Sequence, residues 1–234
     1  MKKILLKILK NKLVASKLQK MILNLHSTTY TLSSTIAIVV NEGVHPKHRI
    51  MKYKEWFLDH IRSDWVVLDI GCNTGMMPEV MAKKAKFVYG LEIDECHIIE
   101  ARKIRQSENI EFICADATLY DYTKLKAVDC VTLSNVLEHI DCRVEFLKAL
   151  VKGVKWNNKK RLLIRVPMID REWLSVYKKE LDLEYRLDKT HCIEFTYLDF
   201  EKELALAGIR VNSHDVKFGE LYAICEASND PIAD

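Results

Sequence analysis

The 234-residue sequence contains only four prolines and seven glycines, too few for a low-complexity linker. Its seven cysteines stand singly, no CxxC pair occurs and the count is odd, so no disulfide framework is expected in a chain of this size. Several cysteines sit inside apolar runs, where a free thiol behaves as a small hydrophobic side chain. These features favour one globular core in a reducing, cytoplasmic compartment.

Two further absences concern apolar runs and acidic residues. No apolar run reaches 18 residues, so no transmembrane helix is expected. Lysines interrupt every N-terminal run that could form the core of a signal peptide. Residues 1–41 hold seven lysines and no acid, so this segment has a charge of +7. Because the net charge of the whole chain is +3, the remaining residues carry −4. The basic excess therefore belongs to the N-terminus.

The first residues alternate lysine with leucine and isoleucine. A helix would place Ile4, Leu5, Ile8 and Leu9 on one face, with Lys3, Lys7 and Lys10 opposite. Two interpretations of residues 1–25 stay open. The segment lies on an anionic membrane as a peripheral helix, or it packs on the domain or on a partner chain.

From about residue 64, short apolar runs rich in β-branched residues alternate with helical patterns. The predicted strands are 65–70, 87–93, 110–115, 128–134 and 161–167, and the predicted helices between them are 76–85, 94–106 and 141–153. This alternation is typical of a parallel sheet with helices on both faces. A last helix begins after Thr196 and stops at Gly208, and two strands separated by Gly219 follow. Their succession predicts an antiparallel strand at the end of the sheet.

The turn after the first strand, in "VVLDIGCNTG" (66–75), carries an acid and two glycines. Ligands of open α/β sheets bind outside the carboxyl ends of the strands, and glycines there let the backbone approach closely. The spacing is not the GxGxxG of dinucleotide enzymes, and Asp69 would repel a pyrophosphate but suits a cation. Asn73 stands where a middle glycine is usual, and Asn tolerates positive φ well.

This turn resembles motif I of the class I S-adenosylmethionine-dependent methyltransferases, and three later motifs are similar to that family in the same order over residues 64–226. The resemblance implies a Rossmann-like, seven-stranded, mostly parallel sheet with one antiparallel strand. It divides the chain into a helical extension (1–60) and a methyltransferase domain (61–234), with 167–195 as a lid or substrate insertion. The implied cofactor is S-adenosyl-L-methionine. The cofactor-binding positions that match are Asp69, Gly71, Cys72, Asn73, Gly75, Glu92, Ala115, Asp116, Ser134 and Tyr53.

Each of these acids has a second interpretation. Glu92, 17 residues after Gly75, matches the acid that takes both ribose hydroxyls, and Asp116 matches the one that faces the adenine amino group. Asp69 alternatively caps its own turn, while Glu92 and Asp116 alternatively are solvated acids at strand ends.

"NVLEH" (135–139) raises the question of a metal. Some relatives have ExxEH at this place and hold a divalent ion, but here Asn135 stands at the first carboxylate. Because Glu138 and His139 alone make a poor site for a hard cation, no required metal is predicted.

A hydroxyl acceptor must lose its proton during methyl transfer, and histidine is the usual base. The favoured candidates for this base are His139 and then His191, ahead of His45, His48, Asp170 and Glu172. In the alternative interpretation, His139 forms only a hydrogen bond with a neighbouring carbonyl. The basic cluster in 42–57 would bind a phosphate or carboxylate, or is simply a solvated helix start after Pro46. Residues 167–195 are loosely similar to methyltransferases of glycan biosynthesis.

The predicted function is O-methylation of a small polar molecule, a sugar or a lipid-linked glycan. A nucleic-acid partner is disfavoured because the methyltransferase region is net acidic. Two alternatives remain: a non-catalytic S-adenosylmethionine-binding or scaffold protein, and an aminopropyl transferase on the same fold. The sequence gives no indication of oligomeric state.

Overall fold

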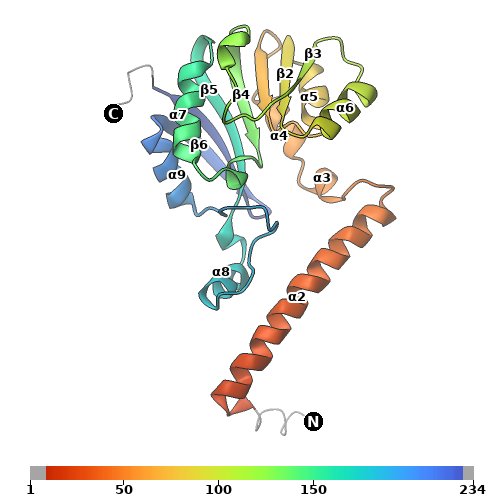
Figure 1. Ribbon diagram of the computed structural model, residues 1–234, viewed down its shortest axis with the longest axis vertical. Helices are drawn as coiled ribbons and strands as arrows, with labels where there is room; N and C mark the ends of the chain where they lie inside the picture. The colour runs from red at the N-terminus through yellow and green to blue at the C-terminus, as the bar shows by residue number, and fades with distance from the viewer. Residues whose placement is uncertain (1–8, 229–234) are drawn as a thin grey trace.

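The computed structural model describes residues 9–228, and seven strands form one sheet in the order β3-β2-β1-β4-β5-β7-β6 (Figure 1). The strands are β1 (Val66–Ile70), β2 (Phe87–Glu92), β3 (Ile110–Cys114), β4 (Val128–Ser134), β5 (Trp156–Pro167), β6 (Ile209–Lys217) and β7 (Glu220–Ala227). The α-helices are α2 (Lys12–Val40), α3 (Lys47–Ile50), α4 (Tyr53–Asp59), α5 (Met76–Ala82), α6 (Glu95–Ile104), α7 (Arg143–Gly153), α8 (Trp173–Glu180) and α9 (Tyr197–Leu206). Short 3-10 turns are η1 (Tyr122–Lys124), η2 (Leu137–His139) and η3 (Ile169–Arg171).

The sheet confirms the predicted mostly parallel topology. β1 to β5 pair in parallel, and the strand order reverses between β1 and β4. β7 runs antiparallel to both β5 and β6, so a single strand opposes the rest. The expectation that this strand lies at the end of the sheet is wrong, because β6 forms the edge. β7 is apolar and almost wholly buried, whereas the polar side chains of β6 are mostly exposed.

Helices cover both faces of the sheet. On one face, α7 and α9 contribute Phe146, Leu150, Phe200 and Leu204 to the larger core cluster. On the other face, α4 and α5 pack Phe57 and Met81 against Val67 of β1. Because α4 belongs to this core, the residues just before the predicted boundary at 60 pack on the sheet; the boundary itself stays a prediction.

The last helix has the predicted ends. The Thr196 hydroxyl accepts the Asp199 N–H at the start of α9, and Gly208 follows the helix in the left-handed conformation with φ of +71°. All seven cysteines are free thiols, and Cys72, Cys130 and Cys225 are buried. These three therefore act as core side chains, as the sequence indicated.

The insertion at 167–195 is closed at its base. Met168 and Phe195 form an isolated parallel bridge, in which the Ile169 N–H donates to the Phe195 carbonyl and the Phe195 N–H donates to the Pro167 carbonyl. The segment between them contains η3 and α8 and hangs from the sheet at the end where the parallel strands finish (Figure 1).

Helix α2 projects beyond the sheet and reaches the insertion rather than the core (Figure 1). Of its 29 residues only Leu23 is buried. Hydrogen bonds join this helix to α8: the Tyr177 hydroxyl donates to Gln19, and the Lys178 ammonium donates to the Ser27 hydroxyl. Residues 1–8, which carry most of the predicted amphipathic pattern, lie outside the described residues. No helix in the described part of the chain is long and apolar enough to span a membrane.

Removing the Phe57 ring tests the packing of α4. Phe57 has no exposed surface, so Phe57→Ala is expected to lower the free energy of unfolding by about 3–5 kcal/mol, measured by urea denaturation. Leu198, which is 73% exposed, is the control, and Leu198→Ala is expected to change it by less than about 0.5 kcal/mol. Equal effects of the two substitutions would show that α4 does not pack on the sheet.

Candidate functional site

The turn between β1 and α5 alternates left-handed residues. Gly71, Asn73 and Gly75 have φ of +72°, +48° and +75°. A Cβ on Gly71 would lie 2.6 Å from Cγ2 of Val136, so the backbone there lies directly against the segment that follows β4. Asn73 therefore adopts the conformation expected of the glycine that it replaces.

Glu92 at the end of β2 holds this turn. Its Oε2 accepts the Asn73 N–H at 2.9 Å, and its Oε1 accepts the N–H groups of Ile93 and Asp94 at 3.0 and 3.1 Å. The side chain is 9% exposed. Glu92 is thus not a solvated acid at a strand end; its contact with a ribose stays a prediction.

Asp69 is in β1, paired with Thr132 of β4, and is almost wholly buried. Its Oδ1 accepts the Thr132 hydroxyl at 2.5 Å, so its observed partner is on the neighbouring strand rather than in its own turn. The pKa of Asp69 is raised to about 7, chiefly by burial; the Thr132 hydrogen bond opposes this rise and the nearby Glu92 carboxylate adds to it. A cation bound outside the strand ends would favour the ionised form.

The other predicted cofactor residues surround the same strand ends. The Cys72 N–H, like that of Gly71, donates to the Leu91 carbonyl, and the Ala115 N–H donates to the Glu92 carbonyl. Asp116 caps its own turn through Oδ1, which accepts the N–H and the hydroxyl of Thr118. Ser134 ends β4 and is partly buried.

Tyr53 begins α4 and lies against the start of α5. Its hydroxyl is 2.6 Å from Nδ1 of His48 and donates to the sulfur of Met76. The guanidinium of Arg165, at the carboxyl end of β5, stacks on the Tyr53 ring at 4.0 Å. Burial lowers the pKa of His48 to about 4, with Lys47 adding to the effect, so this imidazole is neutral at physiological pH.

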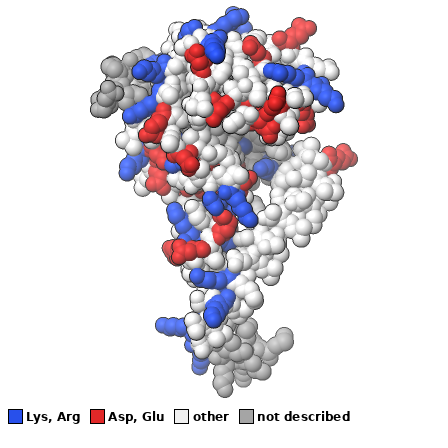
Figure 2. Space-filling view, in the orientation of Figure 1, with Lys and Arg blue, Asp and Glu red and all other residues white. Residues whose placement is uncertain are grey.

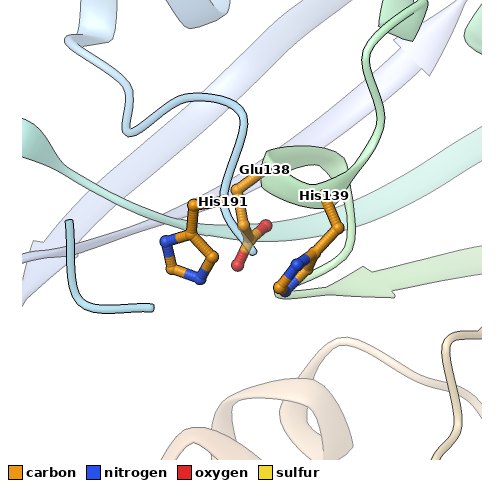
Figure 3. Close-up of side chains that lie close together, drawn as sticks. All are labelled: Glu138, His139 and His191. Atoms are coloured by element: carbon orange, nitrogen blue, oxygen red, sulfur yellow. The ribbon is translucent and has the colours of Figure 1, made fainter. Parts of the chain in front are cut away.

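The two favoured histidines lie together although they are 52 residues apart in the sequence. The His139 and His191 rings have centroids 4.8 Å apart (Figure 3). His139 Nδ1 contacts the Thr190 hydroxyl, and His191 Nδ1 contacts Oε1 of Glu194 at 3.3 Å. Each Nε2 is left without a partner among the described residues. Burial, followed by the neighbouring His191, lowers the pKa of His139.

Glu138 completes this group, and one ligand atom from each of Glu138, His139 and His191 lies within 4.8 Å of the others. Neither carboxylate oxygen of Glu138 has a hydrogen-bond partner among residues 9–228, and burial raises the pKa of the group to about 8. The sequence argument against a metal assumed one Glu and one His, whereas the fold adds His191. One carboxylate and two imidazoles fit a first-row transition metal better than Mg²⁺. A cation there would polarise a bound hydroxyl; the prediction that no metal is required stays untested.

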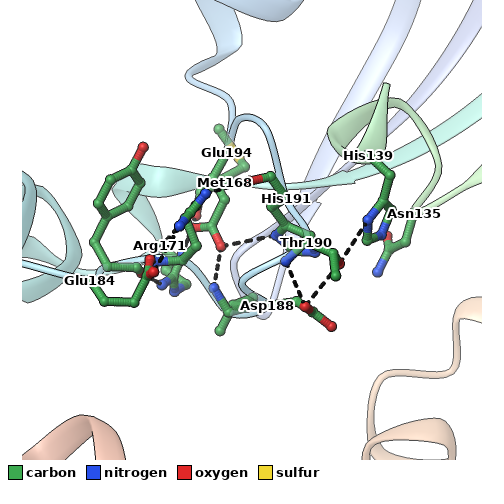
Figure 4. Close-up of polar contacts among 12 residues, drawn as sticks. Asn135, His139, Met168, Arg171, Glu184, Asp188, Thr190, His191 and Glu194 are labelled. Carbon is green, nitrogen blue, oxygen red and sulfur yellow. Dashed lines mark hydrogen bonds and ion pairs between the residues drawn. The ribbon is translucent and has the colours of Figure 1, made fainter. Parts of the chain in front are cut away.

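A polar network extends from the histidines into the insertion (Figure 4). The buried carboxylate of Glu194 contacts His191, pairs with Arg171 and accepts the Leu187 N–H. Arg186 donates to the His191 carbonyl at 2.7 Å. Sequence reasoning did not identify Glu194, although an acid three residues after a histidine in "HCIE" was a usable signal.

The sequence is similar to a methyltransferase family model and to curated proteins. Residues 68–157 match the family model described as a methyltransferase domain. An uncharacterized protein of Methanocaldococcus jannaschii is 24% identical over 178 residues, which cover 67% of this chain and 69% of that protein. A ubiquinone biosynthesis O-methyltransferase of Idiomarina loihiensis is 30% identical over 117 residues, which cover 47% of each chain.

Solved structures share the fold. A SAM-dependent methyltransferase from Aquifex aeolicus superposes with a TM-score of 0.59 at 18% identity, over 78% of this chain and 94% of that chain. The magnesium protoporphyrin IX methyltransferase from Synechocystis, solved with bound S-adenosylhomocysteine (SAH), also gives a TM-score of 0.59 at 18% identity, over 78% and 83%.

The hydrogen bonds by which the Glu92 carboxylate holds the β1–α5 turn can be tested directly. Glu92→Gln replaces one acceptor oxygen by an amide that cannot accept the turn's N–H groups, and it removes the charge available to a ribose. We expect the substitution to weaken SAH binding by about tenfold or more in calorimetry, because hydrogen bonds to a charged group are worth about 1.5–3 kcal/mol.

Glu95 is the matched control, since it is exposed and has no side-chain partner among the described contacts. Glu95→Gln should bind SAH like the wild type. Unchanged affinity in Glu92→Gln would separate Glu92 from the cofactor site.

Proposed function

The chain carries a class I S-adenosylmethionine-dependent methyltransferase domain, and from this premise we propose that it transfers the methyl group to an oxygen atom of a small polar molecule, a sugar or a lipid-linked glycan. S-adenosylmethionine is the cofactor of the domain. Bound there, it supplies an activated methyl group on a sulfonium, a good leaving group. The protein then has to position the acceptor and take its proton.

The pair of imidazoles at the exit of β4 carries the proposal of an oxygen acceptor. An amine or thiol with a free lone pair needs no strong base, whereas a hydroxyl does. His139 has an Nε2 without a partner among the described residues and lies beside the segment that contacts Gly71, and its pKa is lowered by desolvation and by His191. His191 is oriented by Glu194 and lies edge-on to His139, so it positions that ring.

The relatives support the same acceptor atom. Several curated proteins that match this chain are ubiquinone biosynthesis O-methyltransferases, although the chain covers less than half of their length. The aminopropyl-transferase alternative lacks such support, since the structural neighbours above are methyltransferases.

Loss of the proposed base should slow the reaction without affecting the cofactor. Acceptors that differ only in carrying a hydroxyl, an amine or a thiol are incubated with S-adenosylmethionine, and SAH release is followed by mass spectrometry. We expect turnover of a hydroxyl acceptor, and a fall in kcat of about 100-fold in His139→Gln. SAH affinity should stay unchanged in that variant.

The dependence of kcat on pH tests the same base. A base acts in its neutral form, which predominates above its pKa, so lowering the His139 pKa below 6.5 moves the acidic limb of the kcat profile below pH 6.5. This limb should disappear in His139→Gln. Methylation of the amine analogue alone, at the same rate in both proteins, would contradict an oxygen acceptor.

We also propose that α2 holds the enzyme on an anionic membrane surface. Ile22, Leu25, Leu32, Ile36 and Val39 form one stripe, and each is between 51% and 75% exposed. Residues 21–41 contain no charged residue, and Figure 2 shows this uncharged surface along the helix. The lysines precede the stripe, so the helix combines apolar area with positive charge, as interfacial helices do.

Vesicle flotation tests this surface. We expect the protein to float with phosphatidylglycerol vesicles but not with phosphatidylcholine vesicles, and to lose flotation when Ile22, Leu25 and Ile36 are all changed to Asn. Leu119, which is 83% exposed outside α2, is the control as Leu119→Asn. Equal flotation of the triple variant and the control would remove the membrane proposal.

A further inference from the structure

The proposed function leaves the acceptor's binding site unassigned, and a cleft between α2 and the insertion is available for it. The cleft has a volume of about 930 Å³ and opens between residues 24–35 of α2 and residues 171–189 of the insertion. A second groove of similar volume runs between α9 and β6 and includes neither the two histidines nor any of the predicted cofactor residues. Only the first of these two adjoins the histidine network.

One wall of this cleft is cationic. It contains Arg171, Lys178, Arg186 and Lys189, against two acids, Glu172 and Glu184. Arg171 and Arg186 are already paired, with Glu194 and Glu184 respectively. The two lysines have no carboxylate within 4.0 Å among the described residues, so the wall keeps an unneutralised positive charge.

Lys178 is buried without an ion pair among the described residues, and Glu172 is the acid whose charge acts on it, raising its pKa against the larger lowering effect of burial. Lys178 is only 7% exposed. Its ammonium donates to the Ser27 hydroxyl at 2.9 Å and lies 3.4 Å from Nδ1 of His26. A buried ammonium is costly unless it is compensated by an opposite charge. An anion in the cleft would add a closer opposite charge to that of Glu172.

The other wall is a row of hydroxyls. Thr28, Thr31 and Thr35 follow one another along α2 at spacings of three and four residues, and all three line the cleft. Each donates its hydroxyl to the carbonyl four residues earlier, at 3.1 Å. Their oxygen lone pairs are therefore available to accept hydrogen bonds from hydroxyl groups of a ligand.

The cationic wall continues to the proposed base. Arg186 donates to the His191 carbonyl, Arg171 pairs with Glu194, and Glu194 contacts the His191 ring beside His139 (Figure 4). Arg171 and Arg186 line the cleft and also belong to this network, so a ligand in the cleft would lie beside the network that reaches the histidines.

We propose that this cleft binds the methyl acceptor and that the acceptor is a phosphate-bearing polyol, such as a sugar phosphate. Lys178 and Lys189 bind the phosphate, and the threonine row accepts the hydroxyls of the polyol. The proposal rests on the proposed methyltransferase function and deepens it, because it names the class of acceptor and the residues that select it.

Calorimetry with glycerol 3-phosphate as the probe tests the cleft, with the full chain saturated by SAH. We expect the probe to bind, glycerol not to bind, and the double variant Lys178→Met, Lys189→Met to bind at least tenfold more weakly. Lys126, an exposed lysine outside the cleft, is the control as Lys126→Met. Circular dichroism and SAH binding check that every variant is folded.

The outcomes separate the two proposals. If SAH binds but glycerol 3-phosphate does not, or binds the double variant like the wild type, the cleft assignment is overturned and the methyltransferase function stands. If SAH fails to bind the folded wild type, the proposed function fails. Competition with phosphatidylglycerol vesicles distinguishes the sources of the phosphate: displacement of the probe assigns the site to a lipid head group, and retention assigns it to a soluble phosphate.

Discussion

The clamp of the β1–α5 turn by the Glu92 carboxylate is the interaction on which the site depends. Asn73 and the two flanking glycines adopt left-handed conformations, and Glu92 ties the Asn73 backbone to the end of β2, where the Leu91 carbonyl also accepts the Gly71 N–H. Because the turn is fixed there, Gly71 can lie against Val136, which brings the exit of β4 next to it. The histidines and the insertion are then arranged around that exit.

The sheet was largely predictable because its central parallel strands, β1, β2 and β4, are almost wholly buried and read as mostly apolar runs. The start of β5 was not: the strand begins at Trp156, which pairs with Val128, rather than at 161. The residues 157–159 that follow Trp156 are polar and exposed, so no apolar run marked the first part of the strand. The position of β7 between β5 and β6 was also missed, because the sequence of the β6–β7 hairpin does not indicate which of its two strands forms the edge of the sheet. The length of α2 had no signal in its periodicity, because few of its residues pack on anything.

Many individual residues of the candidate site could be named from the sequence, but the contacts between them could not be predicted. The conformation of Asn73 followed from the tolerance of Asn for positive φ. His139 and His191 were both named, but their contact depends on the Met168–Phe195 bridge that closes the insertion, which is a long-range pairing. The same closure buries Glu194 and places the insertion opposite α2. Helix α2 thus has two different surfaces, a hydroxyl row toward the cleft and an apolar stripe toward the solvent.

The central claim is that the strand-end turn holds S-adenosylmethionine with its methyl group directed at the two histidines. A crystal structure of the chain with SAH tests it most directly. The account predicts the ribose beside Glu92 and the sulfur facing the space between the turn and His139. Ordered SAH at any other place on the protein, with the Glu92 side chain and the histidine pair untouched, would contradict it.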